Sequence, residues 1–157
     1  MIMAKLDPID RAIIQSLQRD GRMAVQDISE RVGLSPTPCR RRIRILEETG
    51  VITGYSAMVD PKACGLSLSL YVFIKLERRT RENIRLFEEA IMRMDKVLQC
   101  QLITGAYDYL LTMHVPDMSN YEALLRYELA DVPAIAEIQT SIVISEVKAK
   151  REFALPE

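Results

Sequence analysis

The sequence predicts an α+β fold made of two unlike domains, and the spacing of its apolar residues carries this prediction. Up to residue 48, apolar side chains recur every three or four positions, which is typical of amphipathic helices. From residue 68 onward, segments of alternating apolar and polar residues appear between helical segments, which is typical of strands in an α+β domain. Residues 61–67 separate the two patterns and contain Pro61 and Gly65. We therefore expect domains at residues 1–60 and 68–157, joined by a linker at 61–67.

The first domain is predicted to contain three helices, at residues 7–19, 25–32 and 35–48. Gly33 supplies the sharp turn between the second helix and the third. Ser35 suits an N-cap, and Pro36 suits the first helical turn, where its missing N–H is not needed. Two short strand-like runs follow, at residues 51–53 and 55–59. Three helices followed by a hairpin indicate a winged helix-turn-helix.

The second domain alternates strands and helices in a characteristic order. Strands are predicted at residues 68–77, 97–104, 108–115 and 138–147, and helices at 80–94 and 118–130. The order βαββαβ predicts a ferredoxin-like domain. In the first strand Leu, Val and Ile side chains occupy one face, whereas Tyr71 and Phe73 occupy the other. We therefore expect both faces of the sheet to be covered, the second one by the sheet of another copy of the chain.

The third helix carries the strongest functional signal. Cys39, Ile43 and Leu46 share one face and are expected in the core. An arginine cluster alone would indicate only a solvated helix, but the three-helix spacing, the glycine turn and the hairpin favour DNA binding. Arginine pairs with guanine edges and with phosphates, so we expect double-stranded DNA to contact Ser35, Thr37, Pro38, Arg40, Arg41 and Arg44. Arg42 lies at the margin of the core, and the sequence leaves open whether it contacts DNA or forms a structural ion pair.

Composition narrows the remaining classes of function. Hydrophobic residues make up 48% of the chain and charged residues 27%, as in soluble globular proteins. No apolar run approaches the roughly 20 residues of a membrane helix, and Met1–Lys5 lacks the start of a secretory leader. The widely spaced Cys39, Cys64 and Cys100 indicate free thiols, so we expect a cytoplasmic protein without a membrane partner. His114 is the single histidine and no catalytic motif is present, so we expect no metal, no cofactor and no enzyme activity.

Four motifs carry a resemblance to a known family. They are residues 32–39 (VGLSPTPC), 50–55 (GVITGY), 104–109 (TGAYDY) and 115–118 (VPDM). In this order they resemble the Lrp/AsnC family of prokaryotic regulators, and the leucine-responsive branch is the most similar. The resemblance spans nearly the whole chain, with one departure at Pro133-Ala134, where the family often has Pro-Gly. It implies a sequence-specific transcription regulator that forms dimers through its C-terminal sheets, often assembles into octamers, and responds to an amino acid.

Residues 104–109 form the candidate effector loop. A tight glycine loop offers backbone N–H groups to a carboxylate, and Asp108 offers an acceptor to an ammonium group. Taken alone, these residues fit better with a plain β-hairpin turn that carries a solvated aspartate. The resemblance favours the effector interpretation, because in that family the corresponding loop lies in a cleft between subunits. The candidate set is Thr104, Gly105, Tyr107, Asp108, Tyr109, Thr140 and Ser141, although Tyr109 also alternates with core residues.

Two alternatives stay open at the level of the sequence. Certain sirohaem decarboxylases resemble the same family, but they need a catalytic histidine or arginine in a pocket, and His114 is the one histidine here. An architectural DNA-binding protein without an effector also fits the first domain.

Overall fold

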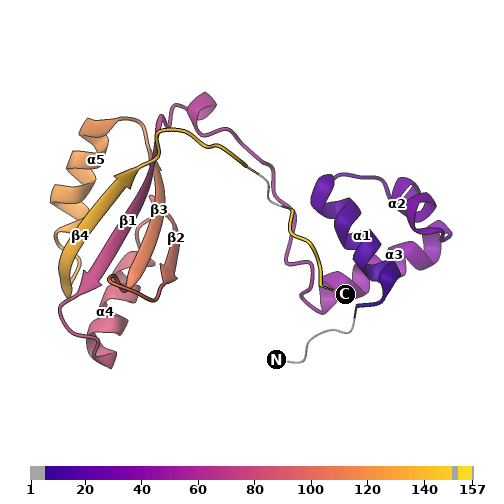
Figure 1. The fold of residues 1–157 in the computed structure, drawn as a ribbon, viewed down its shortest axis with the longest axis horizontal. Helices are drawn as coiled ribbons and strands as arrows, with labels where there is room; N and C mark the ends of the chain where they lie inside the picture. Colours follow the sequence, from indigo (N-terminus) through magenta and orange to yellow (C-terminus); the bar gives the residue numbers. More distant parts are fainter. Residues whose placement is uncertain (1–5, 150–151, 157) are drawn as a thin grey trace. The chain divides into compact units, whose positions relative to one another are not determined.

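A computed structural model describes residues 6–149 and 152–156, and the expectation about a leader at residues 1–5 lies outside them. The chain forms two compact units (Figure 1). The first contains the residues up to 58 together with the tail that starts at Lys148, and the second runs from Val59 to Val147. The sequence prediction places the tail in the second domain, whereas its packing belongs to the first. The linker at residues 61–67 stays a prediction.

Three helices build the first unit: α1 (Pro8–Arg19), α2 (Val25–Val32) and α3 (Pro36–Glu48). Their bounds agree with the sequence prediction to within one residue. At the start of α1, Asp7 accepts the Asp10 N–H at 2.8 Å and Asp10 accepts the Asp7 N–H at 3.3 Å, a reciprocal cap that fixes the first turn. Gly33 ends α2 at φ 70°, a left-handed conformation that glycine adopts without strain. The core contains Ile13, Ile14, Ile28, Cys39, Ile43 and Leu46.

The strands predicted after α3 do not form, since residues 49–60 contain no strand. The first of these two runs is instead tied to the end of the helix. The Gly50 N–H donates to the Glu47 carbonyl at 3.0 Å, and the Ile52 N–H donates to the Leu46 carbonyl at 2.9 Å. The Ile52 side chain also packs against the core. The first run therefore follows the end of α3 instead of pairing, and the predicted hairpin is wrong because neither run forms a strand.

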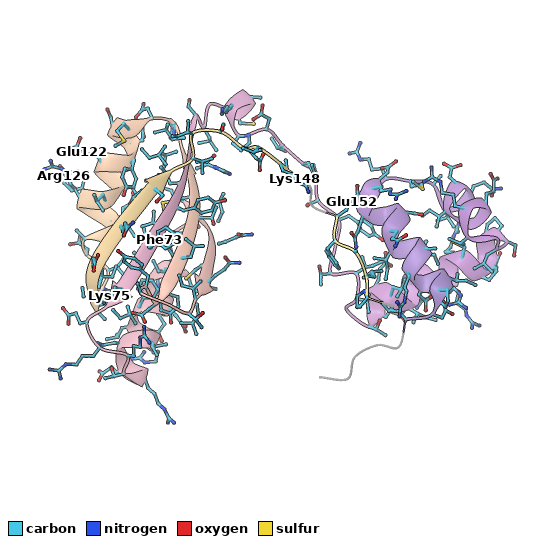
Figure 2. All side chains as sticks on the ribbon, viewed as in Figure 1. Phe73, Lys75, Glu122, Arg126, Lys148 and Glu152 are labelled. Atoms are coloured by element: carbon cyan, nitrogen blue, oxygen red, sulfur yellow. The ribbon has the colours of Figure 1, made fainter. Side chains whose placement is uncertain are left out.

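The C-terminal tail packs against α1. Leu155 contacts the apolar core of the first unit, and the Phe153 N–H donates to Gln18 Oε1 at 3.0 Å. Arg19 Nε lies 3.6 Å from a carboxylate oxygen of Glu152, which Figure 2 labels. Arg11 Nη1 also donates to the Pro156 carbonyl, so one apolar contact and three polar contacts explain why the tail belongs to the first unit.

The second unit is a four-stranded antiparallel sheet. After a short 3-10 turn η1 (Lys62–Cys64), its elements are β1 (Leu68–Leu76), α4 (Arg81–Ile91), β2 (Val97–Leu102), β3 (Tyr109–Val115), α5 (Met118–Leu124), the π-helical turn η2 (Leu125–Leu129) and β4 (Ile135–Ile142). The strand order is β2-β3-β1-β4, and every neighbouring pair is antiparallel (Figure 1). This arrangement is ferredoxin-like, so the predicted βαββαβ fold is confirmed.

The last strand differs from its predicted bounds of 138–147, because β4 begins at Ile135 and ends at Ile142. Its one hydrogen-bonded neighbour in the sheet is β1, and the Ser69 carbonyl near the start of β1 accepts the Val143 N–H at 2.9 Å. Beyond this point Ile144 is 96% exposed. The β-branched composition alone predicts a longer strand, but a strand ends where its partner ends.

One face of the sheet is covered and the other is open. Both helices pack on the covered face, in a core that includes Leu70, Val72, Ile74, Phe87, Ile91, Leu111, Met113, Tyr121, Leu124 and Leu129. The open face carries Tyr71, which is 43% exposed, and the half-buried Phe73; Figure 2 labels Phe73 and Lys75 on β1. No helix within residues 6–149 has both the length and the apolar character needed to cross a membrane.

Candidate DNA interface and effector loop

The outer face of α3 carries the residues predicted to contact DNA. All six are exposed, namely Ser35, Thr37, Pro38, Arg40, Arg41 and Arg44. The opposite face is buried, as predicted for Cys39, Ile43 and Leu46. Ser35 occupies the N-cap position, but its side chain makes no capping hydrogen bond. The N-terminus of α3 and its arginines therefore form one solvent-facing surface.

The arginines on this surface differ in their partners. Arg44 Nε lies 2.7 Å from Glu48 Oε1, one helical turn away. Arg40 and Arg41 have no ion-pair partner among the described residues. Because an exposed ion pair contributes only about 0–1 kcal/mol, Arg44 can exchange Glu48 for a phosphate at little cost. Three arginines on this face are thus available to nucleic acid.

Arg42 points away from this surface and joins α3 to α1. Its Nη1 donates to Asp7 Oδ2 and to Asp10 Oδ1, each at 2.7 Å. The hydrogen bond from the Asp10 backbone, aided by Arg42, lowers the pKa of Asp7 below its ordinary value. Both carboxylates belong to the cap of α1, so one guanidinium ties the start of α1 to the side of α3. The sequence left open whether Arg42 contacts DNA or forms a structural ion pair, and the structure shows the ion pair.

The candidate effector loop connects β2 to β3 at the end of the sheet where β1 ends and β4 begins (Figure 1). The Ile103 N–H donates to the Asp108 carbonyl at 2.9 Å and closes the loop. The Asp108 N–H donates to the Ile74 carbonyl at 2.8 Å and attaches the loop to β1. Gly105 has φ +122°, a conformation that side chains with a Cβ rarely adopt. The loop is thus a hairpin connection that needs its glycine, with Thr104 and Gly105 exposed.

Asp108 is buried and paired, which corrects the interpretation of a solvated aspartate, whereas its contact with an effector stays a prediction. It is 4% exposed. Its Oδ2 accepts the Leu76 N–H at 2.8 Å, and its Oδ1 is paired with the guanidinium of Arg79. Each carboxylate oxygen thus has one partner, and with 4% of the residue exposed little of the carboxylate is accessible to an ammonium group. Asp108 instead fastens the loop to the end of β1.

The two tyrosines of the loop motif have different environments. Tyr109 is 2% exposed, packs its ring against Phe87 and donates its hydroxyl to Glu88 Oε1 at 2.8 Å. Burial, and then Glu88, raise the pKa of Tyr109 well above its usual range. Tyr107 is half-buried and donates its hydroxyl to Glu137 Oε1 at 2.9 Å. Tyr109 is therefore a core residue, as its alternation with core residues allowed, whereas Tyr107 remains partly exposed.

Thr140 and Ser141 do not join the loop. As neighbours on β4 they lie on opposite faces of the sheet, and Thr140 hydrogen-bonds the Tyr121 hydroxyl on the helix-covered side. Thr140 pairs with Val72, two residues before Ile74, where the loop is attached. At about 3.4 Å per residue, Thr140 lies about 7 Å along the strand from this attachment, and Ser141, which pairs with Tyr71, lies about 10 Å from it.

Arg79 is a loop neighbour that sequence reasoning missed. It lies between β1 and Thr80, the N-cap of α4, and its side chain is 68% exposed. No spacing rule relates residue 79 to residue 108, so the pair becomes visible once β1 and β3 are adjacent. The one sequence signal for this pair was Asp108, because an aspartate next to a glycine turn could have prompted a search for a cationic partner such as Arg79.

Other features lie away from the loop. One hollow of about 630 Å³ follows α4, and another of about 590 Å³ lies between α1 and α3; neither is lined by residues of the loop. His114, on which the decarboxylase alternative depends, pairs with Ser69 at the opposite end of the sheet.

Comparisons with known proteins agree with these two units. The family profile described as winged helix-turn-helix DNA-binding matches residues 6–53, and the profile of the Lrp/AsnC ligand binding domain matches residues 69–153. The leucine-responsive regulatory protein of Escherichia coli K12 is 41% identical over 150 residues, which cover 96% of this chain and 92% of that protein.

Two solved structures match nearly the whole chain. A transcriptional regulator of Neisseria meningitidis in complex with L-Met has a TM-score of 0.89 at 32% identity, with 97% of each chain covered. An AsnC family transcriptional regulator from Agrobacterium tumefaciens has a TM-score of 0.87 at 32% identity, covering 94% of this chain and 96% of that one. With its ligand-binding profile, its close relative and its fold in agreement, the chain belongs to the Lrp/AsnC family of transcription regulators.

Proposed function

We propose that the chain regulates transcription by placing α3 in the major groove of its operator, and that a free amino acid modulates this binding. The exposed face of α3 is the observation that supports this proposal most directly. Arg40 and Arg41 have no ion-pair partner in the described chain, and Arg42 fixes the helix that presents them. Guanidinium groups on such a face can pair with guanine edges and with phosphates.

The open face of the sheet supports a dimer. Tyr71 and Phe73 lie on the face that neither helix covers, and two such faces packed together would bury their rings. A dimer would present two copies of α3 to half-sites about one helical turn apart. Further assembly to an octamer would raise avidity for DNA. A DNA partner also implies a cytoplasmic location.

The effector class is supported by a relative and by the loop. The Neisseria meningitidis regulator, 32% identical, was solved with L-Met. In this chain the loop is exposed around Gly105, and its Asp108 forms a charged pair with Arg79, which follows β1. Because the tip of the loop is exposed, from Thr104 to Ala106, we propose that a second copy of the chain completes the site. An effector that binds one assembly state better than another would shift operator binding accordingly.

The reading role of α3 is tested with a duplex that the wild-type chain selects from random-sequence DNA. Arg41→Ala should cost about 1–3 kcal/mol of binding free energy if Arg41 reads a base, and it should mainly reduce the salt dependence if it contacts a phosphate. Affinity is titrated at several salt concentrations.

Arg126→Ala is the matched control, because it removes the same charge from η2 in the second unit. Arg126 is exposed and lies 2.8 Å from Glu122; Figure 2 labels both. The control should bind DNA like the wild type. If the Arg41→Ala/Arg44→Ala double variant also binds like the wild type, α3 is not the reading helix.

A further inference from the structure

We propose that Arg79 binds the carboxylate of the effector and that the buried Asp108 holds its guanidinium in place. The inference rests on the proposed function, in which an amino acid binds at the loop. It reverses the charge expected there, because the sequence suggested that Asp108 binds the ammonium end of the ligand.

The contact between the two side chains leaves the outer end of the guanidinium open. Arg79 meets Asp108 Oδ1 through Nε, and its two terminal nitrogens have no acceptor among the described residues. The side chain is 68% exposed. Two free terminal nitrogens match the geometry of a carboxylate, which they can bind through two parallel hydrogen bonds.

Asp108 contributes by fixing Arg79 before the ligand arrives. The carboxylate is anchored by the Leu76 N–H at 2.8 Å, so it is a rigid point of attachment for a long and otherwise mobile side chain. Ordering a flexible side chain opposes binding, and an arginine that is already held loses less entropy when the ligand arrives. Asp108 is therefore a positioning residue, and Arg79 is the residue that touches the ligand.

The surroundings of the pair leave space for a small molecule. Arg79 follows β1 and Asp108 precedes β3, so both lie at the end of the sheet that carries the loop (Figure 1). At Gly105 a Cβ atom would meet no heavy atom within 4 Å. The loop therefore presents its backbone at Gly105 to open space, three residues before the Asp108 that holds the guanidinium, and its N–H groups can add to the binding of a carboxylate.

The test compares an amino acid with its own carboxamide, which keeps the ammonium group and the side chain but lacks the negative charge. The full-length wild-type chain is titrated calorimetrically with the twenty proteinogenic L-amino acids, and the tightest binder is compared with its carboxamide. We expect the acid to bind about tenfold to a hundredfold more tightly than the amide. In Arg79→Gln this preference should vanish, with both ligands binding about as weakly as the amide binds the wild type.

Two further variants separate binding from folding. Arg78→Gln removes a neighbouring exposed arginine and should keep the wild-type preference. Arg79→Lys keeps a positive charge for Asp108 but lacks the two-pronged end, so it should retain thermal stability and lose most of the preference. The inference is overturned if Arg79→Gln, folded by circular dichroism, still prefers the acid. If no amino acid binds the wild type, the proposed effector class fails and the inference fails with it.

Discussion

Replacing Ala134 with glycine should stabilise the second unit, because this alanine occupies a left-handed backbone conformation. Ala134 has φ 69° and is the one non-glycine residue with positive φ in the described chain. The turn is held from both sides, since the Ala134 carbonyl accepts the Glu77 N–H at 2.9 Å and Ile135 begins β4 by pairing with Leu76. The sequence departs from the Lrp/AsnC pattern at this position, where a glycine is usual.

The magnitude follows from two opposing terms. A left-handed conformation costs a residue with a Cβ about 1–2 kcal/mol, which glycine avoids. Glycine also gains freedom in the unfolded chain, which lowers the free energy of unfolding by about 0.4–1 kcal/mol. The expected net stabilisation is about 0.5–1 kcal/mol, or about 2–8 °C in Tm for a unit of this size.

Scanning calorimetry of the full-length chain at fixed protein concentration measures this shift. Ala130→Gly is the matched control, because Ala130 is exposed and has φ −65°. The same chemical change there should destabilise the unit by about 0.5–1 kcal/mol, since no strain is relieved. If Ala134→Gly lowers Tm as Ala130→Gly does, the turn is unstrained in solution and the reasoning is refuted.

Two further predictions concern polar contacts that the fold revealed. Tyr109→Phe removes the hydroxyl that donates to Glu88 at 2.8 Å. This variant should lower the free energy of unfolding, measured in urea, by about 0.5–1.5 kcal/mol and leave amino-acid affinity unchanged. A loss of effector binding without a loss of stability would instead place Tyr109 in the ligand site. The Asp10 N–H and Arg42 lower the pKa of Asp7 below its ordinary 3.8. Between the folded and the unfolded pKa of Asp7, the folded state therefore holds fewer protons than the unfolded state. The free energy of unfolding should therefore be undiminished above about pH 4 and fall as the pH drops through the folded pKa of Asp7. Arg42→Gln should weaken this dependence of stability on pH. Urea unfolding at pH 5 and at pH 3 measures the difference. If the variant keeps the pH dependence of the wild type, Arg42 does not stabilise the Asp7 carboxylate.

Arg42 and Arg79 together illustrate how ion pairs serve function without acting as the main source of stability. Both pairs are partly exposed, so each contributes modestly to the free energy of unfolding. Their effect is geometric. Arg42 fixes the angle at which α3 presents Arg41, and Asp108 fixes where Arg79 presents its terminal nitrogens. In the proposed roles, a shift of the helix would misplace Arg41 relative to DNA, and a shift of the loop would misplace Arg79 relative to the effector.

The sequence alone determined the elements whose signals are local. The burial of Cys39, Ile43 and Leu46 follows from a period of 3.6 residues, which any helix obeys whatever it packs against. The strand order of the second unit follows from the sequence of strand and helix signals, because few topologies join such elements with short connections. The left-handed turn at Gly33 follows from the one residue type that adopts it freely.

Tertiary structure decided which side chains meet. Arg42 reaches carboxylates 35 and 32 residues away, and Asp108 reaches an arginine on the far side of α4 and β2 in the sequence. The offset of Thr140 and Ser141 from the loop and the end of β4 were set by the register with β1. Periodicity states which face of an element is buried, but not which element covers it or at what offset. Charge pairs and strand ends depend on that offset to within a few ångströms, and the packing of the whole core fixes it.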